Sequence, residues 1–181
     1  MNSAEEIQGA LRRVRRRGVR RWGSSRAVAA VTVVIAGGGP AVLLARRAGA
    51  HSAEFALPGG LTDRWESASS AGRRRLTGEL GMRLPPESVL GLLDDYVTHT
   101  RLVITPVVLW AGEQAPAAGV LAVPFADLDV EPVFVASSES DRPVIRLPLH
   151  GGWLHAPTAA VLHQFREVVL HRRRHSRIAA T

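Results

Sequence analysis

Residues 60–82 read GLTDRWESASSAGRRRLTGELGM, and the second half of this stretch has the pattern of a helix that ends at a glycine. Leu76 and Leu80 are one helical turn apart, and Gly81 follows them directly. This order is typical of a helix with a glycine C-cap. We therefore predict a helix over residues 66–80, one face of which carries an arginine, a glycine and a glutamate at neighbouring positions.

Apolar segments on both sides of this helix predict a sheet. The run AVAAVTVVIA (27–36) is continuous and rich in β-branched residues, as expected of a buried strand. The following GGGP (37–40) predicts a turn. The patterns predict further strands and helices, with strands at 41–47, 54–60, 88–95, 102–110, 121–125 and 144–149, helices at 4–17 and 157–171, and a helical or looped stretch up to Phe134. Hairpins with helices between them indicate the α+β class.

Length and composition indicate one domain with short appendages. The chain has 181 residues, 46% of them apolar, which is enough for a substantial core. Its longest apolar run is shorter than the about 20 residues that span a bilayer. Arginines stand where a signal peptide would be apolar, and the absence of cysteine excludes disulfides and thiolate zinc sites. A cytoplasmic protein is expected.

The positive charge is concentrated at the two ends. All 23 basic residues are arginine and the net charge is +7. Seven arginines lie in residues 1–21 and five in residues 166–181, whereas the middle has 11 arginines and 13 acidic residues. Such ends are typical of segments that bind nucleic acid, an anionic membrane or an acidic partner. The apolar edge Ile7–Leu11–Val14 favours instead packing on the same domain or on a second subunit, as in a homodimer.

The spacing around the predicted helix resembles the Nudix box, a glycine, a glutamate after five residues, and an arginine-led helix that ends at a glycine. Gly60, Glu66, Arg74, Glu79 and Gly81 fall on its positions. An arginine, a histidine and Pro-Gly-Gly upstream, in the stretch LLARRAGAHSAEFALPGG, resemble the coenzyme A pyrophosphatase-like branch. The resemblance covers roughly residues 27–171 and implies the Nudix fold, a mixed β-sheet sandwiched between α-helices. It divides the chain into an arginine-rich amphipathic helix and linker (1–25), a Nudix domain (26–171) and a basic tail (172–181).

The box departs from the family pattern at two of its three glutamates. The family's trio holds magnesium, which takes oxygen ligands and orients water for attack on a diphosphate. Here Arg75 and Gly78 stand at two of these positions, so Glu79 alone remains. A guanidinium at about 4–5 Å would repel a cation by several kcal/mol even at an effective dielectric near 20. We therefore expect that the usual magnesium cluster does not form, and no other cofactor is identified.

The resemblance also assigns the candidate site residues. Glu79 is the candidate catalytic residue and metal ligand. The candidates for ligand binding are Arg46, His51, Gly60 and Arg75. A guanidinium suits phosphate or carboxylate and would replace the charge of the metal. Glu66 and Arg74 are expected to form a structural salt bridge, with Gly81 as the end of the helix.

Three functions follow from these residues. The first is the binding of a phosphorylated or other anionic small molecule without standard metal-dependent hydrolysis, in a sensor or a repurposed biosynthetic enzyme. The alternative is a metal-dependent Nudix hydrolase that acts on a nucleoside diphosphate derivative such as coenzyme A. A second alternative is an arginine-mediated interaction or nucleic-acid-binding protein. A histidine, His99 or His155, would form a general acid–base pair with Glu79 if the fold brought them together.

Overall fold

A computed structural model describes residues 3–20, 24–47, 54–138, 140–149 and 151–172. The candidate ligand residue His51 lies outside the described residues, as does most of the predicted basic tail. Within the described part, no helix is both long and apolar enough to cross a membrane.

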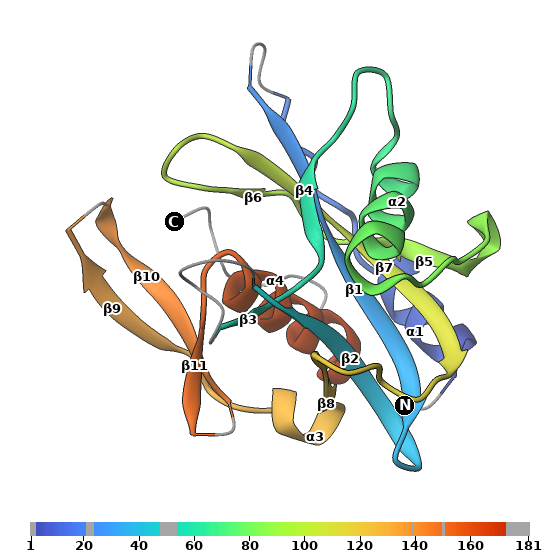
Figure 1. Cartoon of the computed structure of the whole chain (residues 1–181). Helices are drawn as coiled ribbons and strands as arrows, with labels where there is room; N and C mark the ends of the chain where they lie inside the picture. The colour runs from blue at the N-terminus through green and yellow to red at the C-terminus, as the bar shows by residue number, and fades with distance from the viewer. Residues whose placement is uncertain (1–2, 21–23, 48–53, 139, 150, 173–181) are drawn as a thin grey trace.

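A large mixed sheet forms the centre of the molecule (Figure 1). Its main path runs β3-β2-β1-β7-β5, with β4 on β1, β6 on β7 and β8 on β2. The bounds of these strands are β1 Arg26–Ala36, β2 Gly39–Arg46, β3 Phe55–Ala56, β4 Gly59–Leu61, β5 Val89–Leu92, β6 Tyr96–Val97, β7 Val103–Glu113 and β8 Val120–Pro124. β1 and β7 are parallel, with Val31 opposite Val108, and the other pairs are antiparallel.

The long apolar run of the sequence is β1, which is covered on both faces. Val31 and Val33 pack in the larger core cluster, whereas Val28 and Ala30 pack in a second cluster on the opposite face. Side chains alternate between the two faces of a strand, so a strand covered on both sides is apolar throughout. The predicted mixed sheet between helices is confirmed.

Helix α2 (Ala68–Leu80) covers the face of the second cluster. The hydroxyl of Ser67 caps its amino end, accepting the N–H of Ser70, and Gly81 ends it in the left-handed conformation (φ 68°). Gly72 brings the helix against the sheet, because a Cβ there would lie 3.0 Å from the Cβ of Val107. The predicted helix and its glycine C-cap are confirmed, with a start two residues later than predicted.

Helices α1 (Ala4–Arg12) and α4 (Thr158–Phe165) cover the other face, and α1 is shorter than predicted. The apolar edge of α1 packs on the chain's own domain, since Ile7 and Leu11 are buried in the main cluster. The prediction that this helix extends to residue 17 is wrong. The chain leaves the helix after Arg12 because the next residues bind a pair of aspartates on the domain.

The carboxyl-terminal part adds a small sheet and an unusual helix end. Two short helices, η2 (Pro86–Ser88) and α3 (Phe125–Leu128), precede the three-stranded sheet of β9 (Val133–Ser137), β10 (Ser140–Leu149) and β11 (Gly152–His155). The prediction missed β9, which has exposed apolar residues, and β11. The last turns of the predicted final helix form a π-helix, η3 (Arg166–Leu170), and Arg166 and Glu167 are buried in it.

Candidate functional site

A cavity of about 570 Å³ lies where strands β1 to β4 meet the end of α2 and the start of α4. Its walls are largely apolar, with Leu57 and Ile104 among them. The polar and glycine residues that line it are Arg46, Arg47, Glu54, Gly59, Gly60, Glu79, His155 and Thr158. Three of the residues predicted from the sequence, at positions 46, 60 and 79, therefore line one cavity. A largely apolar hollow with a few polar groups is typical of small-molecule sites.

Glu79 is held at the cavity by the backbone of the glycine pair. Its Oε1 accepts a hydrogen bond of 2.9 Å from the N–H of Gly59. Gly59 itself lies close to strand β1, where only glycine fits, because a Cβ there would lie 2.4 Å from the carbonyl oxygen of Val28. The residue as a whole is exposed, but its carboxyl end has lost hydration, and this raises the pKa of Glu79. The hydrogen bond from Gly59 and the charge of Arg75 both lower this pKa, but their effect is smaller.

A pair of arginines borders the cavity on the side of β2 and β3. The guanidinium of Arg46 lies over the ring of Phe55, 4.8 Å from its centroid. This cation–π contact limits the rotamers of Arg46. Next to it, Arg47 forms an ion pair of 3.6 Å with Glu54. The rim therefore carries a guanidinium stacked on an aromatic ring and, next to it, an ion pair.

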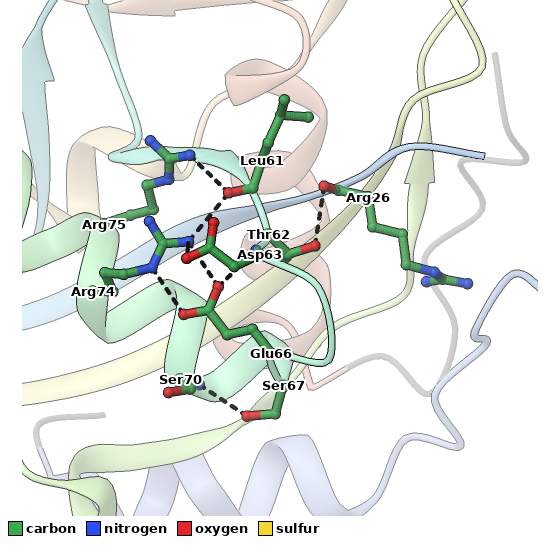
Figure 2. A network of polar contacts seen from close by, with 9 residues as sticks. All are labelled: Arg26, Leu61, Thr62, Asp63, Glu66, Ser67, Ser70, Arg74 and Arg75. Carbon is green, nitrogen blue, oxygen red and sulfur yellow. Dashed lines mark hydrogen bonds and ion pairs between the residues drawn. The ribbon is translucent and has the colours of Figure 1, made fainter. Parts of the chain in front are cut away.

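Arg75 does not line the cavity. Its Nη2 donates a 2.7 Å hydrogen bond to the carbonyl of Leu61, and its guanidinium lies against Gly60 (Figure 2). A Cβ at Gly60 would be 2.7 Å from Cζ of Arg75, and the backbone there has φ +147°, which also favours glycine. The charge of Arg75 lowers the pKa of both Glu66 and Glu79. Arg75 is thus an internal cation that joins α2 to the preceding loop.

The three positions of the predicted patch separate in space. Glu79 faces the cavity, Arg75 folds over Gly60, and Gly78 lines a different depression on the outer side of α2, next to Arg73 and Arg74. The spacing i, i+3, i+4 places these three residues near one another on α2. The loop before α2, which packs on the helix, decides which surface each of them reaches.

Glu66 and Arg74 connect the loop to the helix by a bidentate ion pair (Figure 2). Arg74 donates hydrogen bonds of 2.8 and 2.7 Å to the two carboxylate oxygens of Glu66, and Glu66 also accepts the N–H of Asp63. The hydrogen bond from Arg74 is the main cause that lowers the pKa of Glu66 to about 2. The geometry gives these two residues a structural position outside the cavity lining.

We expect Glu66→Gln to lower Tm by a few degrees near neutral pH, because the loop loses its charged anchor. The lowered pKa means that ionised Glu66 stabilises the fold above its ordinary value of 4.5, and that this stabilisation disappears as the pH falls toward 2. The Tm difference between wild type and variant, measured by calorimetry, should therefore shrink over that interval. Glu87→Gln, at an exposed position, is the control, and a difference that stays constant down to about pH 2 would contradict the argument.

His155 is the histidine that the fold brings to this cavity. It lies at the end of β11 and lines the same hollow as Glu79, whereas His99 does not line it. His51 and His150 lie outside the described residues. The prediction missed Arg47, Glu54 and Thr158, whose hydroxyl accepts the N–H of Leu57. The charged pair could have been found, because Arg47 is the last residue of one predicted strand and Glu54 is the first residue of the next.

Magnesium is the metal that the sequence resemblance implies, and the described residues do not fit its site. Among them, no three His, Asp or Glu side chains come close enough to hold a metal ion. Glu79 has a guanidinium beside it, and Glu54, the other carboxylate of the cavity, is paired with Arg47. Magnesium requires several oxygen ligands in near-octahedral order.

Comparisons with known proteins agree with the architecture. Residues 25–136 match the family model described as NUDIX domain. A crystal structure of the Nudix hydrolase RenU from M. smegmatis is 24% identical over 84% of this chain and 91% of its own, with a TM-score of 0.52. A MutT/nudix family protein from Enterococcus faecalis is 18% identical over 87% of this chain and 65% of its own, with a TM-score of 0.51. No curated protein matches the chain.

Proposed function

Because this chain belongs to the Nudix family, we propose that its cavity binds a phosphorylated or other anionic small molecule without the standard metal-dependent hydrolysis. Such a protein would act as a ligand sensor or as an enzyme with a different activity in a biosynthetic pathway. The coenzyme A pyrophosphatase-like features of the sequence make coenzyme A and related nucleoside diphosphate derivatives the first ligands to test.

The position of Arg75 is the observation that carries this proposal. Its guanidinium is fixed by Leu61 and acts on the carboxylate of Glu79, where the family pattern places an additional acid. A divalent cation about 5 Å from this guanidinium would meet a repulsion of several kcal/mol at an effective dielectric near 20. Glu79 supplies one carboxylate where magnesium requires several oxygen ligands, so an anionic ligand is favoured over a metal ion at this end of the cavity.

Arg46 is the proposed contact for the anion. Its guanidinium lines the cavity and is positioned by Phe55. A planar guanidinium binds two oxygens of a phosphate at once. His155, which also lines the cavity, supplies a second nitrogen donor when the ring nitrogen facing the ligand carries a proton.

Ligand binding is expected to be independent of divalent metal and to depend on Arg46. A thermal-shift series with coenzyme A, ADP-ribose and pyrophosphate should show a ligand that raises Tm equally with chelator and with magnesium. Arg46→Gln should weaken binding of that ligand about 10-fold or more in calorimetry, since a hydrogen bond to a charged group contributes about 1.5–3 kcal/mol. Arg64→Gln, at an exposed arginine outside the cavity lining, is the matched control.

The ordinary hydrolase is the second candidate, favoured by the presence of Glu79 in the cavity. It requires release of product from a diphosphate substrate only when magnesium or manganese is present, and its loss in Glu79→Gln. That combination would replace the proposal. Ligand binding that is abolished by a chelator would also contradict the proposal, even if no product were released.

A further inference from the structure

Residues 12–20 form an arginine arm, defined by the side chains of Arg12, Arg13, Arg15, Arg17 and Arg20, whose backbone is attached to the domain. The N–H of Arg17 donates to Asp94 Oδ1 (2.6 Å), and the carbonyl of Arg17 accepts the N–H of Asp95 (3.1 Å). Two residues further on, the N–H of Val19 donates to Asp95 Oδ2 (2.8 Å). An arginine-rich segment that could have been a mobile tail is therefore held in place.

One further arginine of this segment serves as the anchor. Arg16 donates through Nε to the carbonyl of Leu93 (3.0 Å) and forms an ion pair with Asp95. The carboxylate of Asp95 is almost fully buried, and it also accepts the hydroxyl of Thr105. The two aspartates are thus used to fix the backbone of the segment, and they do not neutralise the five side chains of the arginine arm.

Those five side chains are exposed and carry uncompensated charge. All five residues are exposed, and none of their guanidinium groups has a hydrogen-bond or ion-pair partner in the part of the chain that the structure describes. Glu5 and Glu6 lie in the first turn of α1, at the far end of that helix from the arm. Five fixed like charges along one segment repel one another, and a row of anionic groups would relieve that repulsion.

We propose that the arginine arm is a binding surface for the phosphate backbone of a nucleic acid, without sequence preference. Guanidinium groups bind phosphate oxygens in pairs, and a nucleic acid offers the linear array of phosphates that a single small anion lacks. A lipid surface is less well matched, because the apolar edge of α1 is not available for insertion. Ile7 and Leu11 are buried in the domain core. This surface is separate from the cavity, whose lining contains none of the arm residues.

Preorganisation gives the arm its expected strength. A disordered basic tail loses conformational entropy when it binds, whereas the backbone hydrogen bonds to Asp94 and Asp95 have already fixed this segment. The binding should therefore be strongly salt-dependent, with a slope of log K against log salt of about −0.9 for each phosphate contact.

Fluorescence anisotropy with the full chain and a labelled DNA duplex of about 20 base pairs tests the proposal over a salt series from about 50 mM. The triple variant Arg12→Gln/Arg13→Gln/Arg15→Gln should bind at least about 10-fold more weakly at the lowest salt, with a slope smaller by about 2–3. The control variant Arg64→Gln/Arg83→Gln/Arg101→Gln has the same net charge as the arm variant, but its substitutions are at exposed arginines outside the arm. It should bind the duplex like wild type.

The outcomes separate this surface from its alternatives. The triple variant should keep the wild-type Tm, because the substituted side chains are exposed. If its Tm falls, the single charge reversal Arg13→Glu provides an independent test of binding. Equal loss in the arm variant and the control would show that only net charge matters and would overturn the proposal. Wild-type binding by both arm variants would overturn it too, as would tighter binding to phosphatidylserine vesicles than to the duplex.

Discussion

Replacing Arg166 with methionine is expected to lower the free energy of unfolding by about 3–5 kcal/mol, because it removes the guanidinium partner of the buried carboxylate of Glu167, whose contact with His171 is longer, at 3.4 Å. Arg166 is buried in η3, where Nη1 pairs with Glu167 (3.1 Å), Nε with Asp129 (2.9 Å) and Nη2 with Glu131 (2.7 Å). The side chain of Glu167 is only 5% exposed, so water cannot replace the lost guanidinium. Urea unfolding monitored by circular dichroism measures the loss.

Two further variants make this expectation specific to the buried charge. Arg166→Met/Glu167→Gln should recover a large part of the loss, since the double variant buries no unpaired charge. Glu131→Gln removes a partner whose side chain is 85% exposed, and should cost less than about 1 kcal/mol. An Arg166→Met protein as stable as wild type, or a double variant as unstable as the single one, would contradict the assignment.

Two glycines of the box region should respond to alanine in opposite directions. At Gly59 a Cβ would lie 2.4 Å from the carbonyl oxygen of Val28 and 3.3 Å from the Cα of Ala29, both in the backbone of central strand β1. The strand pairing of β1 with β4 would have to open, at a cost of about 3 kcal/mol. Since the N–H of Gly59 positions Glu79, Gly59→Ala should also weaken ligand binding in the cavity.

Gly78→Ala is the matched substitution in helix α2. A Cβ at Gly78 meets nothing within 4 Å, and the position is exposed. Alanine there should stabilise the protein by about 0.5–1 kcal/mol through helix propensity, and leave ligand binding unchanged. Chemical denaturation of both variants gives the comparison. Destabilisation by Gly78→Ala would contradict the open space beside this position of α2, and an unaffected Gly59→Ala protein would contradict the close approach of Gly59 to β1.

Much of the fold was predictable because it rests on local patterns. β1 is read from its apolar β-branched run, and α2 from a periodicity of 3.6 residues that ends at Gly81. The small sheet was harder to predict. β9 has exposed apolar side chains, including Val133 and Phe134, so it lacks the alternation of buried and polar residues by which a strand is recognised.

The sequence by itself determined which chemical groups are present near the box. The spacing between Gly60, Glu66 and Arg74 brings the loop before α2 against one face of that helix. Glu66 and Arg74 therefore form their ion pair from positions close in the sequence. The replacement of two acids by Arg75 and Gly78 is likewise a property of the chain alone.

Only the tertiary structure decided where those groups point. It turned Arg75 onto the carbonyl of Leu61 and away from the cavity, and brought His155 to the hollow that Glu79 lines. It also ended α1 at Arg12, because Asp95 binds a segment that lies far from it in the sequence. Contacts of this kind depend on how separate helices, strands and loops pack together. The local periodicity of a sequence predicts which face of an element is buried, but it does not predict which distant residues that face contacts.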